Sequence, residues 1–188
     1  MSQPELLKRV IRKLESIGVE YMVTGAIASS MHGEPRSTHD IDLVIAIKED
    51  AITRLVEAFS PPDYYLNESS VREAVAEEGM FTLFDKREAA KVDFWVLTNS
   101  PFDQSRFARR CIQKAAKIRM TVSSPEDTIL MKLWWAKQCG RSEKQFMDAL
   151  RVYEVQHGKL DMRYLEEWAK RLRIRGPLNR LKDKAKGL

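Results

Sequence analysis

The chain has 188 residues, a length typical of one domain or of one domain with a helical extension, and its formal net charge is +5. No apolar run approaches the roughly 20 residues that cross a bilayer, and the first residues contain no apolar block of the signal-peptide kind. Cys111 and Cys139 lie outside any Cys-x-x-Cys pair. This cysteine usage argues against a zinc or disulfide framework and favours a cytoplasmic protein with reduced thiols.

The first hundred residues alternate between helical and strand patterns. Apolar spacing and the flanking Gly or Pro residues predict helices over residues 5–17, 27–32, 51–59 and 69–78, the last capped by Ser69 or Ser70. Apolar runs rich in β-branched or aromatic residues predict strands over residues 19–24, 43–47, 64–66, 80–84 and 92–97. The turn-like segment 85–88 joins the last two strands, so we expect a β-hairpin there.

The second half changes from strands to helices. We expect a helix over residues 101–110 and short strands over residues 111–115 and 118–123, with their turn at Ala116-Lys117. Ser124 is the expected N-cap of a helix that reaches about residue 138. Further helices should begin near residues 141 and 161, and Gly176-Pro177 should break the chain before a final basic helix.

Together these patterns indicate an α/β (α+β) fold. A small mixed β-sheet core flanked by helices is expected over residues 1–123, and a C-terminal helical region over residues 124–188.

Two aspartates stand at the start of the most apolar strand. Asp40 and Asp42 are two residues apart, so on a strand their carboxylates point to one face. Like charges so placed repel each other, and a divalent cation such as Mg²⁺ would balance them. Asp93 interrupts a second buried-looking strand. If the two strands are neighbours, Asp93 completes a cluster of three carboxylates that can hold one or two metal ions.

The segment before this pair resembles a phosphate-binding element. A strand leads into Gly25-Ala26 and then into a helix, an arrangement that offers free backbone N–H groups to an anion. Arg36 and Thr38 lie between this turn and Asp40, and they can add a positive charge and a hydroxyl. The order of these features predicts nucleotide transfer from a magnesium-bound triphosphate.

The pattern Gly25-Ala26-x-Ala28, Gly33, Arg36-x-Thr38-x-Asp40-Ile41-Asp42, with Asp93 on a later strand, resembles the nucleotidyltransferase superfamily that includes DNA polymerase beta. Within it, the chain looks most like the AbiEii/AbiGii-type bacterial toxin group and its relatives. That group usually has Gly-Gly or Gly-Ser at the turn, whereas this chain has Ala26, which has no side chain to bond phosphate. It also tends to carry an acid where this chain has Gln145, between Arg141 and Asp148.

The resemblance implies a metal-dependent active site. Asp40, Asp42 and Asp93 would be the catalytic residues and would hold Mg²⁺, as two ions that Mn²⁺ can replace. The triphosphate, for example ATP, would be bound by Gly25, Ala26, Ser29, Arg36, Thr38 and Lys132.

The expected function is magnesium-dependent transfer of an NMP from a nucleoside triphosphate to an acceptor hydroxyl. The acceptor could be tRNA or protein in a toxin–antitoxin or phage-defence setting, with an antitoxin or other partner protein and no membrane. A basic tail slightly favours a macromolecule, since from Lys170 onward eight Lys or Arg residues face Asp183 alone, a net charge of +7. Two alternatives stay open: an inactive nucleotide- or partner-binding module, and transfer to a small-molecule hydroxyl such as that of an aminoglycoside.

Overall fold

The computed structural model of the chain describes residues 3–115, 118–140 and 142–185. The expected turn at Ala116-Lys117, together with Arg141 and Lys186, lies outside the described residues. The helices are α1 (Gln3–Ser16), α2 (Gly25–His32), α3 (Ile52–Ala58), α4 (Glu68–Ala76), α5 (Pro101–Ala108), α6 (Pro125–Gln138), α7 (Glu143–Val155), α8 (Met162–Arg171) and α9 (Arg175–Ala185), and a short 3₁₀ turn, η1 (Glu49–Ala51), precedes α3. The strands are β1 (Glu20–Val23), β2 (Ile41–Ala46), β3 (Tyr64–Tyr65), β4 (Met80–Asp85), β5 (Ala90–Val96), β6 (Cys111–Ala115) and β7 (Ile118–Val122).

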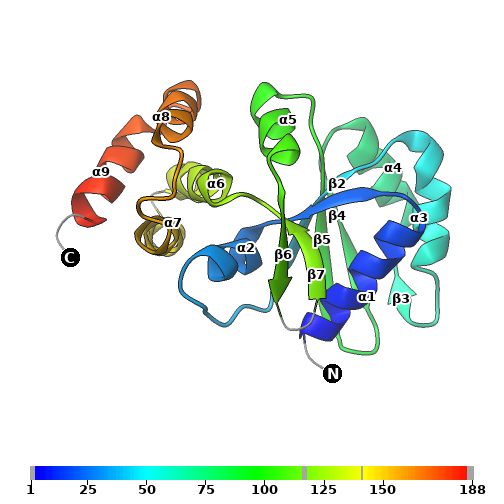
Figure 1. The fold of residues 1–188 in the computed structure, drawn as a ribbon. Coiled ribbons are helices and arrows are strands. Elements are labelled where there is room, and N and C mark those ends of the chain that lie inside the picture. Colours follow the sequence, from blue (N-terminus) through cyan, green and yellow to red (C-terminus); the bar gives the residue numbers. More distant parts are fainter. Residues whose placement is uncertain (1–2, 116–117, 141, 186–188) are drawn as a thin grey trace. The chain divides into compact units, whose positions relative to one another are not determined.

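The strands form one mixed sheet, shown in Figure 1, in the order β3-β4-β5-β2-β1-β7-β6. The pairs β2–β5 and β1–β7 are parallel, and the remaining pairs are antiparallel. The expected fold class, a mixed sheet flanked by helices and followed by a helical region, is confirmed. The expected hairpin is also present, because β4 and β5 pair in antiparallel fashion around residues 86–89.

By internal packing, the described chain divides into two compact units. We call the first the sheet unit, which comprises Met1–Thr24 and Thr38–Val122, and the second the helical unit, which comprises Gly25–Ser37 and Ser123–Leu188. One boundary between the units lies between Val122 and Ser123. Segment 25–37 groups with the C-terminal helices, because α2 packs against α6 and α7.

The two faces of the sheet have different coverings. On one face Phe94 lies 6.2 Å, between ring centroids, from Phe59 at the end of α3, and α1, α3 and α4 add their buried apolar side chains. On the other face Met22 and Val44 pack against Phe107 of α5. Burial of each such side chain contributes about 1.5–3 kcal/mol to the stability of the fold. Packing on both faces of the sheet therefore stabilises the strands that carry the aspartates.

The starts of α4 and α9 differ from the sequence expectations. Asn67, not Ser69 or Ser70, caps α4, since its side chain accepts a hydrogen bond from the Ser70 backbone N–H at 2.9 Å. Gly176 and Pro177 lie in the first turn of α9 and do not break the helix, as proline is tolerated there. The chain turns before α9 at Arg173, whose φ is +58°. Ser124 caps α6 as expected, by accepting from the Asp127 backbone N–H at 3.1 Å.

Across the described ranges, no helix combines the length and the apolar character that a membrane span requires.

Candidate active site

The strand register brings two of the expected catalytic aspartates together. In the parallel pair β2–β5, Asp42 is the direct partner of Asp93, so their Cα atoms lie on neighbouring strands that are about 4.8 Å apart. Asp40 directly precedes β2, and extending the same register by one residue sets it beside Lys91. Asp42 on β2 and both Lys91 and Asp93 on β5 therefore share one face of the sheet. The sequence placed Asp93 beside Asp42 only if their two strands were neighbours, and the structure shows that the strands are neighbours.

Two protein donors hold the Asp93 carboxylate. Thr82, its partner on β4, donates its hydroxyl to Oδ1 at 2.8 Å, and the Lys91 Nζ donates to Oδ2 at 3.1 Å. The Asp93 side chain is 13% exposed and the Lys91 side chain 51%. The hydrogen bond with Asp93, followed by the charges of Asp93, Asp40 and Asp42, raises the pKa of Lys91. One ammonium thus lies within the field of all three carboxylates.

The donor set suits Mg²⁺ in its chemistry, because carboxylate oxygens are the ligands that hard divalent cations prefer. The positions suit it as well, since two of the three aspartates are direct cross-strand partners. Within the part of the chain that the structure describes, however, no three His, Cys, Asp or Glu side chains are arranged to hold a metal ion. Asp93 is bonded to Lys91 and Thr82. A bound metal therefore requires side-chain rearrangement at these positions.

The predicted glycine turn is the first turn of α2. The helix begins at Gly25, two residues earlier than expected, and Gly25 has φ +64°, a conformation that favours glycine. Ser29 is buried, and its hydroxyl donates to the Gly25 carbonyl at 2.9 Å, a bond back along the helix of the kind serine often makes. The Thr24 N–H, immediately before Gly25, donates to the Asp42 carbonyl at 3.0 Å. In the sheet unit, the Thr38 hydroxyl accepts from the Asp40 N–H at 3.2 Å.

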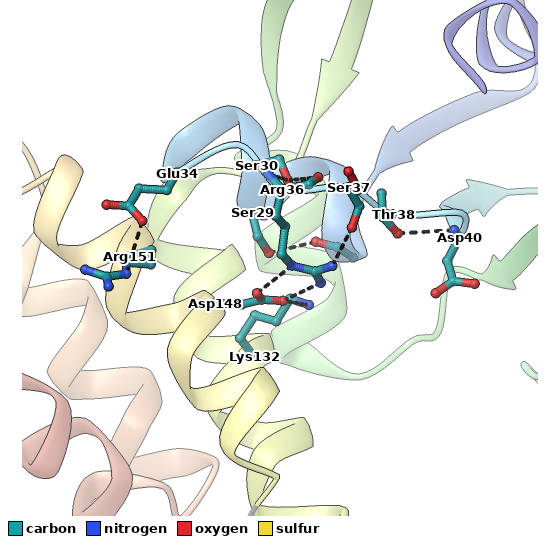
Figure 2. Close-up of polar contacts among 11 residues, drawn as sticks. Ser29, Ser30, Glu34, Arg36, Ser37, Thr38, Asp40, Lys132, Asp148 and Arg151 are labelled. Atoms are coloured by element: carbon teal, nitrogen blue, oxygen red, sulfur yellow. Dashed lines mark hydrogen bonds and ion pairs between the residues drawn. The ribbon is translucent and has the colours of Figure 1, made fainter. Parts of the chain in front are cut away.

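Arg36 and Lys132, both expected to bind the triphosphate, share a carboxylate that the sequence analysis did not include in the site (Figure 2). Arg36 donates Nε and Nη2 to the two oxygens of Asp148, at 2.8 and 2.9 Å, and Lys132 donates Nζ to Oδ2 at 2.8 Å. Asp148 and Lys132 are buried in the helical unit. Burial acts to raise the pKa of Asp148, but the hydrogen bonds from Arg36 and Lys132 outweigh it and lower this pKa.

Asp148 thus holds two cations of the helical unit in defined positions. A sequence signal for Asp148 existed, because it lies among the buried apolar residues of α7, where a charge requires a partner. Glu34 adds a second link between the 33–37 segment and α7, through an ion pair of 3.2 Å with Arg151 (Figure 2). The position of Arg36 within the helical unit is therefore defined by α7.

Acidic residues neutralise part of the basic tail. Arg180 and Lys184 pair with Glu143 at 3.1 and 3.7 Å, and Lys182 pairs with Glu166 at 2.7 Å. Arg171 pairs with Glu167 one helical turn earlier. These ion pairs reduce the charge that the tail can offer to a nucleic acid.

Comparisons with known proteins place the fold. No protein-family model matches the chain, and no curated protein matches it. Several solved structures do. The solution structure of the antibiotic-resistance factor ANT(2'')-Ia is 12% identical, with a TM-score of 0.58 over 90% of this chain and 92% of that one. The crystal structure of ANT(2'')-Ia in complex with adenylyl-2''-tobramycin is 13% identical, with a TM-score of 0.57 over 92% and 98%.

The structure of a different protein gives a similar result. The lincomycin-bound crystal structure of the lincosamide antibiotic adenylyltransferase LnuA is 11% identical, with a TM-score of 0.57 over 82% of this chain and 98% of that one. At such low identity the similarity concerns the architecture, and it does not single out the AbiEii-type group that the sequence pattern resembles. The chain therefore shares the fold of the ANT(2'')-Ia and LnuA structures.

Proposed function

We propose that this protein transfers an NMP from a nucleoside triphosphate to an acceptor hydroxyl, with Asp40, Asp42 and Asp93 as the residues that hold Mg²⁺. The observation that carries the proposal is the β2–β5 register, which makes Asp42 and Asp93 direct partners on one face of the sheet. A charged pair of like sign at this position is unfavourable for stability alone. Binding of a metal ion for nucleotidyl transfer would account for the pair.

Each group has a role in this chemistry. Mg²⁺ bound by the aspartates would stabilise the attacking and departing oxygens of an in-line displacement, most simply as two ions. Asp93 accepts hydrogen bonds from Thr82 and Lys91, which hold its carboxylate on β5. It would act on the acceptor hydroxyl as a base, or as a ligand of the metal ion that binds this hydroxyl. The N-terminal turn of α2, with Gly25 and Ala26, offers backbone N–H groups to phosphate.

The cations of the helical unit form the other part of the proposal. Arg36 and Lys132 are fixed by Asp148, and their cationic side chains would bind the triphosphate. Ser29 and Thr38 are assigned supporting roles in nucleotide binding. The Ser29 hydroxyl orders the first turn of α2, and Thr38 orders the backbone at Asp40.

For the acceptor, we favour a small-molecule hydroxyl over RNA or protein. Among the similar structures, the lincosamide antibiotic adenylyltransferase LnuA is bound to lincomycin, and the antibiotic-resistance factor ANT(2'')-Ia is in complex with adenylyl-2''-tobramycin. The ion pairs of α8 and α9 with acidic residues reduce the attraction of the tail for RNA. A toxin–antitoxin role with a tRNA or protein acceptor is the alternative, and it rests on the sequence resemblance alone.

Labelled transfer tests the proposal. The full chain is incubated with Mg²⁺ and each α-³²P nucleoside triphosphate, with aminoglycosides, lincosamides, tRNA or cell lysate as acceptors. Asp42→Asn and Asp93→Asn should each reduce label transfer on the order of 100-fold or more, while their circular dichroism stays that of the wild type. Asp50→Asn, on the exposed η1 turn, is the matched control and should retain wild-type rates.

Retention of activity in Asp93→Asn would refute the catalytic assignment. An inactive binding module is recognised separately by calorimetry with a triphosphate. Binding that is the same with and without Mg²⁺, combined with no label in any acceptor, would identify such a module.

A further inference from the structure

Lys91 lies where a cation would be bound. It belongs to β5 two residues before Asp93, so both side chains project from the same face of the strand. Its ammonium contacts Asp93 Oδ2 at 3.1 Å. Extension of the β2–β5 register sets Lys91 beside Asp40, next to the Asp42–Asp93 pair. Asp42, Asp93 and Lys91 thus lie on this face, and the charge of Asp40 also acts on the Lys91 ammonium.

The two partners of this ion pair differ in how firmly they are held. The Asp93 side chain is 13% exposed, and the Thr82 hydroxyl fixes its other oxygen at 2.8 Å. The Lys91 side chain is 51% exposed, and a lysine has four rotatable bonds through which its ammonium can swing into water. When the pair separates, Lys91 is therefore the partner that moves.

We propose that Lys91 is a tethered cation that occupies the Asp93 carboxylate until a divalent ion displaces it, and that it thereby sets the metal affinity of the site. The inference depends on the metal site of the proposed function. Two cations repel each other when both contact one carboxylate oxygen, so the ammonium and the metal compete.

Metal binding by variants of the full chain tests the competition. Free Mn²⁺ is measured by electron paramagnetic resonance during titration of the wild type, Lys91→Met, Asp93→Asn and the control Lys86→Met. Lys86 lies in the β4–β5 turn with its ammonium 5.9 Å from the Tyr65 ring centroid. Lys91→Met should bind Mn²⁺ about fivefold more tightly than the wild type, the change expected when an ion pair of this exposure no longer competes. Lys86→Met should bind as the wild type does.

Chemical labelling gives a second readout that is independent of activity. Acetylation with an N-hydroxysuccinimide ester is quantified by mass spectrometry with and without Mn²⁺. Acetylation of Lys91 should increase several-fold when Mn²⁺ releases its ammonium from Asp93, whereas that of Lys86 should stay constant. The inference requires both the affinity change and the labelling change.

The outcomes separate the inference from the proposed function. Equal or weaker Mn²⁺ binding by Lys91→Met, or unchanged Lys91 acetylation in a wild type that binds Mn²⁺ through Asp93, would overturn the role of Lys91 and leave the metal site intact. If neither the wild type nor Lys91→Met binds Mn²⁺ more tightly than Asp93→Asn does, the metal site falls, and the role of Lys91 falls with it. Binding by Lys91→Met alone is the extreme case of the predicted competition.

Discussion

Removal of the Asp148 carboxylate should destabilise the helical unit strongly. In Asp148→Asn the side-chain volume is kept, but the Lys132 ammonium and the Arg36 guanidinium lose a negative charge at 2.8 Å. The Lys132 side chain is only 8% exposed, so water compensates this loss poorly.

The size of the effect follows from burial. Loss of one partner from a buried ion pair costs about 3–5 kcal/mol. The lower end applies here, because Arg36 is 30% exposed and can turn toward water. For a chain of this length, about 3 kcal/mol corresponds to a decrease in the melting temperature of about 6–12 °C.

Thermal unfolding followed by circular dichroism measures this change. Asp183→Asn, at an exposed position of α9, is the control for loss of one negative charge and should melt within about 1 °C of the wild type. Adding Lys132→Met to Asp148→Asn should recover part of the loss, because the buried ammonium is then gone. A decrease below about 2 °C in Asp148→Asn, or a lower melting temperature in the double variant than in the single one, would refute the reasoning.

Two further predictions concern α2. Gly33→Ala should lower the free energy of unfolding by about 1–3 kcal/mol, because an added Cβ would lie 2.8 Å from the Val152 backbone nitrogen. The control Gly79→Ala should lower it much less, since its Cβ would meet nothing closer than 3.8 Å. Equal losses in chemical denaturation would contradict the packing of α2 on α7. Burial, opposed in part by the hydrogen bond with the Ser123 carbonyl, lowers the pKa of His32. The neutral ring therefore stabilises the fold fully above about pH 6.5, and this contribution is lost as the pH falls below that value. His32→Gln should flatten the decrease of unfolding free energy between pH 7 and 5, and an unchanged slope would contradict this account.

The parts of the fold that follow from local pattern could be predicted from the sequence. The β4–β5 hairpin and the cap of α6 depend on residues close together in the chain, so apolar runs and turn residues determine them. Adjacency of Asp42 and Asp93 could be proposed because an aspartate within an apolar strand requires a partner. Their register required the structure, since several strand orders satisfy the same pattern.

Interactions between distant segments could not be predicted in this way. Arg36 and Asp148 are 112 positions apart, and a surface arginine has no local signal that selects one acid among many. The same reason explains why segment 25–37 groups with the C-terminal helices and why the tail cations pair with Glu143 and Glu166. The charged residues can be identified in the sequence, whereas their pairing depends on how the helices pack.

The central claim, nucleotidyl transfer, is tested most directly by the position of the label that reaches the acceptor. Parallel reactions contain one nucleoside triphosphate labelled with ³²P at either the α- or the γ-phosphate, and products are separated by thin-layer chromatography. The account predicts that the α-label joins the acceptor while the γ-label leaves as pyrophosphate, and that Asp42→Asn reduces both the transfer of the α-label and the release of the γ-label on the order of 100-fold or more. Appearance of the γ-label on the acceptor, or transfer of the α-label at the wild-type rate in Asp42→Asn, would contradict it.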